Sequence, residues 1–279
     1  MSAHAGSSLF VSADMEGCAT LVHWDEVRPG ASAAYRRACR VYTDEVKAAV
    51  LGAFDAGYGR AVVNDAHSKM RNLLPEQLST RVELVSGSFK PHYMLQGLAG
   101  GGFAGAFFVG YHGAVGDAEA VMGHTYSPRV IFSCRLQGET VSELAINAAL
   151  SGEFDVPVRL VSGDEATVAE ARRVLPWAVC VETKRSLSYY AADCLSPSVA
   201  CAALRTAAAE AARSTEARPL RLTPPISLEV DTRLTSQADA MGWVPGFERL
   251  GPRTVAFRGS SMLEAYRALM TIIYLGSTA

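Results

Sequence analysis

Short apolar runs alternate with a helical pattern along the first part of the chain. Residues 9–11, 61–63 and 104–110 form apolar runs that predict buried strands. Between the first two runs, apolar residues recur at helical spacing over residues 32–55, and Gly57 provides a C-terminal stop. Strand, helix and strand in this order predict a βαβ unit whose strands are parallel neighbours.

The same reading continues to the end of the chain and predicts an α/β protein. We expect a mainly parallel sheet flanked by helices in three layers, followed by a smaller C-terminal α+β portion. We place the division between residues 1–163, a metal-binding α/β domain, and residues 164–279, a second α/β portion that completes the cleft and the subunit contacts. The alternative is that the two form one domain. The remaining expected elements are strands at 82–85, 130–136, 157–161, 226–230 and 255–257, helices at 141–150, 165–175 and 197–213, a linker at 219–225, and a closing helix whose apolar stripe runs from Met262 to Ile273.

Composition narrows the class of protein. The chain has 279 residues, of which 49% are hydrophobic and 19% charged, as in an ordinary globular protein. A formal net charge of -2 gives no electrostatic reason to expect nucleic acid or an anionic membrane as partner. The N-terminal residues lack the pattern of a signal peptide, and the six cysteines are scattered without a CxxC pair. We therefore expect reduced thiols and a cytoplasmic protein.

Polar residues with metal-binding chemistry follow several of the apolar runs. In a parallel sheet the carboxyl ends of the strands converge, so side chains distant in sequence meet in one cleft. Carboxylates and neutral imidazoles together suit Zn²⁺, and the number of such side chains fits a pair of ions about 3.5–4 Å apart. The candidate ligands are Asp14, Glu16, His67, His112 and Glu143, and His124 stands apart from them in a long loop.

Each of these features has a plainer explanation when it is taken alone. Asp14 and Glu16 could form a solvated acidic turn, and a histidine at a strand end is more often a hydrogen-bonded structural residue. Cys18 beside them could be a nucleophile, although a cysteine at such a place more often fills space beneath a loop. The chain has no Gly-x-Gly-x-x-Gly after its first strand and no Gly-x-Ser-x-Gly, which argues against a dinucleotide site and a serine hydrolase.

Five motifs in fixed order give the chain a specific resemblance to a known family. It resembles the M55 metallo-aminopeptidases, the D-aminopeptidase family of the bacterial dipeptide-permease operon, from about residue 9 to residue 164 and more thinly beyond. The motifs are Ser12-Ala13-Asp14-Met15-Glu16-Gly17, Asn64-Asp65-Ala66-His67-Ser68, Gly110-Tyr111-His112, Gly123-His124-Thr125 and Ser142-Glu143-Leu144-Ala145-Ile146-Asn147.

The resemblance implies a site with two zinc ions per subunit and a ring-shaped homo-oligomer, expected to be a decamer. It implies that the five candidate ligands hold the zinc ions and that His124 is catalytic. The expected reaction is hydrolysis of the N-terminal bond of short peptides or amino-acid amides, those with D-residues included, by a hydroxide formed at the metal.

Roles within this site follow from chemistry and position. Asp14 is our choice for the carboxylate that bridges the two ions, because it lies between the other ligands in the expected arrangement. We keep His124 off the metal, where it would steady the oxyanion or protonate the leaving amine. Asn147 shares a helix face with Glu143, and Asn147 and Asp65 are candidates for orienting ligands or for binding the substrate's amino group.

Three departures from the family leave the substrate open. They are Cys18-Ala19-Thr20, Ser142 and the pair Tyr189-Tyr190, and all fall at expected walls of the cleft. One alternative is therefore a metal-dependent amide or ester hydrolase that acts on an intermediate of a secondary-metabolite pathway. The other is a metal-stabilised scaffold or binding protein with little turnover.

Overall fold

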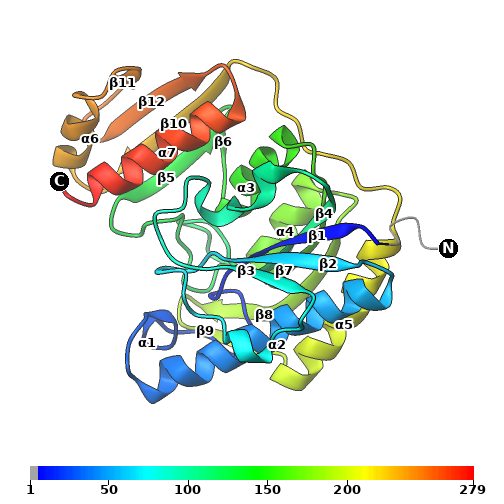
Figure 1. Cartoon of the computed structure of the whole chain (residues 1–279). Coiled ribbons are helices and arrows are strands. Elements are labelled where there is room, and N and C mark those ends of the chain that lie inside the picture. Colours follow the sequence, from blue (N-terminus) through cyan, green and yellow to red (C-terminus); the bar gives the residue numbers. More distant parts are fainter. Residues whose placement is uncertain (1–5) are drawn as a thin grey trace.

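Two β-sheets organise the computed structural model, which describes residues 6–279 (Figure 1). The larger sheet has the strand order β3-β2-β1-β4-β7-β8-β9, and all its neighbours are parallel except the edge pair of β8 and β9. The mainly parallel sheet expected from the sequence is thus confirmed. Its strands are β1 (Ser8–Ala13), β2 (Arg60–Asp65), β3 (Val82–Val85), β4 (Phe103–Tyr111), β7 (Val158–Asp164), β8 (Val179–Ser188) and β9 (Ala191–Cys194).

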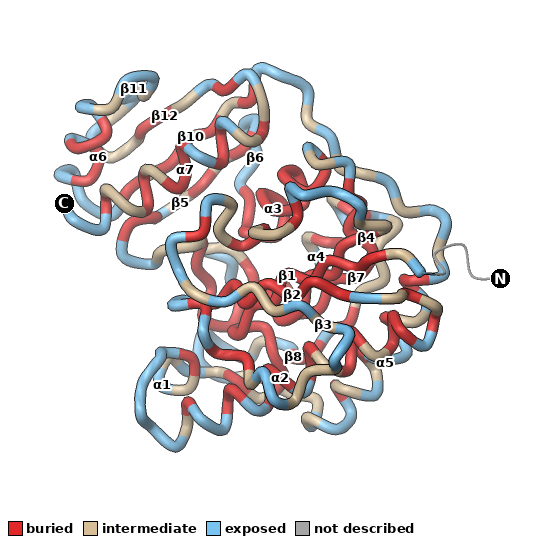
Figure 2. Tube along the Cα trace, viewed as in Figure 1, coloured by how far each residue is buried: buried red, intermediate tan, exposed pale blue. Residues whose placement is uncertain are grey.

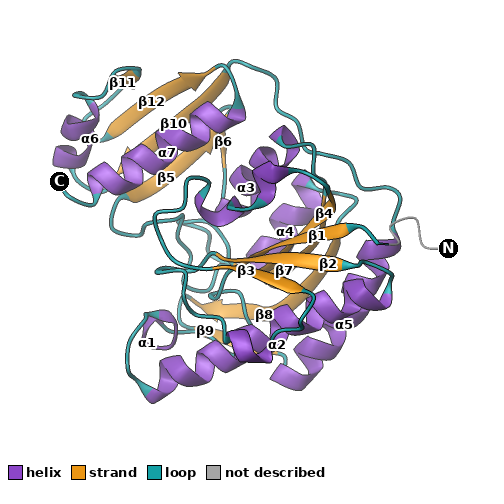
Figure 3. Cartoon of the chain, viewed as in Figure 1, coloured by secondary structure: helices purple, strands orange, loops and turns teal. Residues whose placement is uncertain are grey.

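Helices cover both faces of this sheet and bury its central strands (Figures 2 and 3). Successive side chains of β1 enter different cores: Leu9 and Val11 pack with α2 (Ala33–Asp55) and α5 (Pro197–Arg213), whereas Phe10 belongs to the core on the other side. That second core includes α3 (Glu143–Glu153) and α4 (Glu165–Val174). Because both faces are buried, the strands are continuous apolar runs, as the sequence shows.

The helix ends follow local capping chemistry. Ser32 caps α2 by accepting a 3.0 Å hydrogen bond from the Tyr35 amide, and Gly57 follows the helix with φ +108° as the predicted stop. The helix predicted over 141–150 begins two residues later, because the Ser142 side chain accepts from the Leu144 amide and makes Glu143 the first helical residue.

The smaller sheet is antiparallel and has the order β11-β12-β10-β5-β6. It joins residues from both sides of the predicted division at residue 163, since β5 and β6 precede that residue and β10, β11 and β12 follow it. The larger sheet also crosses the division, because β7 spans it and β8 and β9 lie beyond it. The sheets therefore divide the chain differently from residues 1–163 and 164–279. The elements are β5 (Ile131–Leu136), β6 (Glu139–Thr140), β10 (Ile226–Thr232), β11 (Phe247–Arg249) and β12 (Thr254–Gly259), with α6 (Thr235–Met241) and α7 (Met262–Gly276) packed on them.

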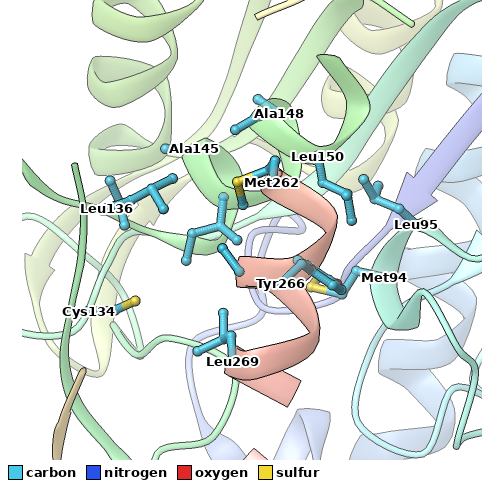
Figure 4. Close-up of a cluster of buried hydrophobic side chains, with 14 of the residues drawn as sticks. Met94, Leu95, Cys134, Leu136, Ala145, Ala148, Leu150, Met262, Tyr266 and Leu269 are labelled. Carbon is cyan, nitrogen blue, oxygen red and sulfur yellow. The ribbon is translucent and has the colours of Figure 1, made fainter. Parts of the chain in front are cut away.

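Helix α7 connects the two parts of the molecule through its apolar stripe. Figure 4 shows Met262, Tyr266 and Leu269 of α7 directed into a cluster that includes Ala145 and Leu150 of α3. All five side chains are at most 5% exposed. The closing stripe is therefore core, and the C-terminal helix is fixed against the helix that begins with Glu143.

Several short elements were not predicted. They carry no clear periodicity, and β8 and β9 lack it as well, because β8 mixes buried and exposed residues irregularly and β9 has no buried residue. The short elements are α1 (Trp24–Val27) and the 3-10 helices η1 (Pro75–Gln77), η2 (Tyr93–Leu95) and η3 (Leu98–Gly100). Among the described residues, no helix combines the length and the apolar character needed to cross a bilayer.

Candidate metal centre

The carboxyl ends of three neighbouring parallel strands deliver most of the predicted ligands. Asp14 and Glu16 follow β1, His67 follows β2, and His112 follows β4. Glu143 arrives from the other direction, as the first residue of α3, where the helix dipole favours a carboxylate. These five side chains and His124 are each at most 7% exposed.

Two glycines allow the loop that follows β1 to lie against the end of β4. A β-carbon on Gly17 would overlap the carbonyl group of Tyr111, and one on Gly110 would overlap that of Asp14. Gly110 also has φ +73°, which disfavours other residues. The backbone amide of Gly17 donates to the Gly110 carbonyl at 2.8 Å, so the turn that carries Glu16 lies directly on the end of β4.

The ligand atoms of the six residues face one another at short range. His67 Nδ1 lies 2.9 Å from Glu16 Oε2 and 3.3 Å from Asp14 Oδ1. His112 Nε2 lies 3.5 Å from Asp14 Oδ2 and 3.4 Å from Glu143 Oε1. Each oxygen of Asp14 thus faces a different histidine, which is the geometry of a bridging carboxylate.

His124 is brought into the same cluster. Its ring stacks on that of His112 with the centroids 4.0 Å apart, and its Nε2 lies 3.9 Å from oxygens of both Glu16 and Glu143. Two groups of three residues have ligand atoms that all lie within 4.8 Å of one another: His112, His124 and Glu143, and Asp14, Glu16 and His112. By distance alone, His124 is therefore placed both for metal binding and for contact with a reacting group.

Backbone carbonyls fix the orientation of all three imidazole rings. The ring nitrogen of His67 that faces away from the cluster lies 2.6 Å from the Val27 carbonyl, that of His112 lies 3.0 Å from Gly113, and that of His124 lies 3.0 Å from Met122. A carbonyl oxygen only accepts hydrogen bonds, so each of these nitrogens carries a proton. A neutral ring then presents a lone pair to the carboxylates, which is the arrangement that metal-ligating histidines adopt.

Two buried atoms in the cluster have no hydrogen-bond partner among the described residues. They are Glu16 Oε2 and His112 Nε2. Buried polar atoms are normally satisfied, because leaving one unpaired costs about 1–3 kcal/mol. Both atoms point at other ligand atoms, so the donor set fits a cation held between them.

The electrostatics of the cluster also call for positive charge. Burial and the neighbouring Glu16 raise the pKa of Asp14 to about 7. Burial acts to lower the pKa of both His67 and His112, but the facing carboxylates outweigh it and raise the pKa of His112 to about 10 and that of His67 well above its usual value. His124 differs, since burial and the charge of His112 lower its pKa to about 4, which keeps the ring neutral at pH 7.

The cluster opens into a cavity of about 720 Å³. Asp14, Glu16, His67, His124 and Glu143 all line it, whereas His112 lies behind His124 and does not. The far wall comes from the smaller sheet's helix α7, which contributes residues such as Ile273 and Tyr274. This volume lies within the range of about 300–1,000 Å³ that is typical of small-ligand sites.

Asp65 and Asn147 lie outside this cavity and hold its walls. The carboxylate of Asp65 accepts from the backbone amides of Asn72 and Leu73, and the Asn72 amide side chain also donates to the His67 carbonyl at 2.8 Å. Asn147 accepts a 2.9 Å hydrogen bond from the Tyr126 hydroxyl. Both side chains are at most 1% exposed, so their position fits an orienting role rather than contact with a substrate's amino group.

Lys184 supports the loop that carries the first two predicted ligands, a role that was not predicted. Its buried ammonium group donates to the carbonyls of Cys18, at 2.9 Å, and of Glu16 and Leu21. Cys18 itself is fully buried, and burial raises the pKa of its thiol well above the usual value. A thiol in this state is not a nucleophile.

Aromatic residues support His124, again without a signal in the sequence. Trp24 packs edge-on against the His124 ring with centroids 5.2 Å apart. Tyr189, in the turn between β8 and β9, lines the cavity, and its carbonyl accepts a 2.9 Å hydrogen bond from the Met122 amide. Of the tyrosine pair expected at the cavity wall, Tyr189 therefore lies there and helps to fix the loop of His124, whereas Tyr190 is not among the lining residues and packs against His23.

Comparison with known proteins agrees with this architecture. The family model of the M55 peptidases, described as D-aminopeptidase, matches residues 8–271. A D-aminopeptidase of Bacillus subtilis (strain 168) is 36% identical over 273 residues, which cover 96% of this chain and 97% of that protein. The solved structure of the Zn-dependent D-aminopeptidase DppA from Bacillus subtilis, a self-compartmentalizing protease, matches with a TM-score of 0.92 and 33% identity over 98% of both chains. The chain is thus an enzyme of the peptidase class and belongs to the M55 family of D-aminopeptidases.

Proposed function

We propose that this protein is a binuclear, zinc-dependent aminopeptidase that removes the N-terminal residue, D-configured by preference, from short peptides. The observation that carries the proposal is the set of three imidazole nitrogens that face three buried carboxylates at the wall of a cavity. A Bacillus subtilis relative that covers nearly the whole chain is a D-aminopeptidase, and the matching solved structure is Zn-dependent.

The distances within the cluster support the ligand assignment. Zinc binds histidine nitrogen and carboxylate oxygen at about 2.0–2.2 Å, so two ligands of one ion lie roughly 3–4 Å apart. The nitrogen–oxygen separations of 2.9–3.5 Å around His67 and His112 agree with this. We assign Asp14 as the bridging ligand, with Glu16, His67, His112 and Glu143 as the others.

The reaction that we propose is hydrolysis of the N-terminal amide bond. Zinc ions at such a site lower the pKa of a water molecule and polarise the carbonyl of the substrate. His124 is neutral at pH 7 and presents Nε2 to the cluster, because Nδ1–H donates to the Met122 carbonyl. Nε2 would accept a proton from the attacking water and pass it to the leaving amine.

One observation favours a second candidate function. Tyr189 lines the cavity close to His124 and enlarges its apolar wall, where the pair Tyr189-Tyr190 departs from the family's usual residues. An amide or ester of a secondary-metabolite pathway would use the same metal chemistry with a bulkier substrate. A non-catalytic metal-stabilised scaffold is the remaining alternative.

Removing two histidine ligands should remove the metal. We expect about two zinc ions per chain in protein purified without chelator, measured by inductively coupled plasma mass spectrometry. His67→Ala/His112→Ala should lose them, because each ion loses a nitrogen ligand. His92→Ala, a histidine outside the cluster, should retain them. Wild-type protein without zinc, or a double variant that keeps both ions, would contradict the assignment.

His124→Ala separates catalysis from metal binding. If His124 transfers protons, kcat should fall by at least about 100-fold while the zinc content stays at the wild-type value. Loss of one zinc ion together with activity would instead make His124 a ligand. Unchanged kcat would favour the non-catalytic scaffold.

A matched substrate series distinguishes the two hydrolase proposals. We expect D-alanyl peptides to be cleaved with a kcat/KM at least about 10-fold above that of their L-alanyl counterparts, with release of the amino acid followed by chromatography. The reference set is amino-acid amides and esters with large apolar leaving groups. Cleavage of that set alone would support the biosynthetic alternative.

We further propose a cytoplasmic homo-oligomer, with a ring-shaped decamer as the specific expectation. All six cysteines are free thiols, and the matching solved structure is of a self-compartmentalizing protease. Large apolar side chains are exposed around the smaller sheet, among them Trp243 at 80% and Leu234 at 55%. Light scattering coupled to size exclusion should give a mass near ten times 29.7 kDa; a monomer would refute the assembly.

A further inference from the structure

The inner and outer parts of the cavity carry opposite charges. Among the described residues that line it, the acidic side chains are Asp14, Glu16 and Glu143, and all three belong to the metal cluster. The basic side chains that line it are Arg28, Lys69 and Arg129, and all three are exposed. Beyond the cluster, the charged groups on the cavity wall are therefore all positive.

These three cations have no anionic partner within the described part of the chain. Other arginines are paired, for example Arg135 with Asp231 at 2.9 Å and Arg205 with Asp55 at 2.7 Å. Neither an ion pair within 4 Å nor a side-chain hydrogen bond occurs for Arg28, Lys69 or Arg129 in residues 6–279. The guanidinium of Arg28 lies over the Trp24 ring, 5.6 Å from its centroid, and leaves its donors free.

The cations line the same cavity as the cluster and are near its residues in the sequence. Arg28 follows Val27, whose carbonyl binds His67, and Lys69 is two residues beyond His67. Arg129 is five residues beyond His124, in the segment that leads into β5. Two residues of extended chain span at most about 7 Å, so the backbone of Lys69 lies within that distance of the backbone of His67.

We propose that Arg28, Lys69 and Arg129 bind the C-terminal carboxylate of a short peptide whose amino-terminal bond lies at the cluster. The proposal rests on the proposed function and names the residues that would recognise the free carboxylate of its substrate. Guanidinium and ammonium groups donate charge-assisted hydrogen bonds to carboxylates, and arginine does so with two parallel donors. A longer peptide would carry its carboxylate past these three side chains and gain less from them.

A pair of substrates that differ only in this charge tests the proposal. Hydrogen bonds to a charged group are typically worth a factor of about 10–100 in binding. We therefore expect wild-type enzyme to cleave D-alanyl-D-alanine with a kcat/KM at least about 10-fold above that of D-alanyl-D-alanine amide. The ratio of acid to amide should fall as ionic strength rises, because the cations are exposed.

The variant Arg28→Gln/Lys69→Gln/Arg129→Gln should reduce the ratio of acid to amide to near 1. Its zinc content, measured in parallel, should remain that of the wild type, which separates lost recognition from a damaged metal site. Arg258→Gln, an exposed arginine outside the cavity, is the matched control and should keep the wild-type ratio.

Four outcomes would overturn the proposal. Equal cleavage of acid and amide by wild-type enzyme would reject the carboxylate subsite and leave the aminopeptidase function standing. An unchanged ratio in the triple variant would reject these three residues. If wild-type enzyme cleaves D-alanyl-D-glutamate α-amide as well as D-alanyl-D-alanine, the subsite binds a side-chain carboxylate instead of the C-terminal one. Cleavage of none of the peptides would reject the proposed function itself, and the subsite with it.

Discussion

The structure depends on a place where three buried carboxylates meet in a small volume. Asp14, Glu16 and Glu143 are each at most 3% exposed, so water does not screen their repulsion. The rise in the pKa of Asp14 shows that repulsion together with the cost of burial. The imidazoles of His67 and His112 face these oxygens, and the negative charge of the carboxylates raises the pKa of both rings despite their burial. A pair of divalent cations would satisfy both sets of groups at once.

Much of the fold exists to hold this unfavourable arrangement in place. Lys184 clamps the Glu16 loop through three carbonyls, and the Val27 carbonyl fixes the His67 ring. On the other side, the Tyr126 amide donates to Glu143 at 2.5 Å, and Glu170 accepts from both the amide and the hydroxyl of the helix cap Ser142. Glu16, His67 and Glu143 thus each have a neighbour that fixes their position, as preorganised metal sites require.

The sequence predicted the parts of this site that strand topology determines. Asp14, His67 and His112 follow apolar runs, and parallel strands bring such positions to one edge. The position of His124 over His112 could not be predicted, because the connecting loop of residues 113–130 has no periodicity. The role of Lys184 was equally hidden, since a lysine near the edge of a sheet usually points into solvent. The prediction that Glu143 and Asn147 share one face of α3 was correct. The hydrogen bond that Asn147 accepts could not be predicted, because its donor, the Tyr126 hydroxyl, lies on a distant part of the chain.

Helix α7 links the stability of the smaller sheet to events in the cavity. The same helix that packs Leu269 against α3 places Ile273 and Tyr274 in the cavity wall. A molecule that binds the folded cavity alone lowers the free energy of the folded state by mass action. Because α7 contributes to both places, occupancy of the cavity slows the local opening of the C-terminal helix. Hydrogen exchange in α7 would thus report ligand binding at the carboxyl ends of the parallel strands, on the opposite wall of the cavity.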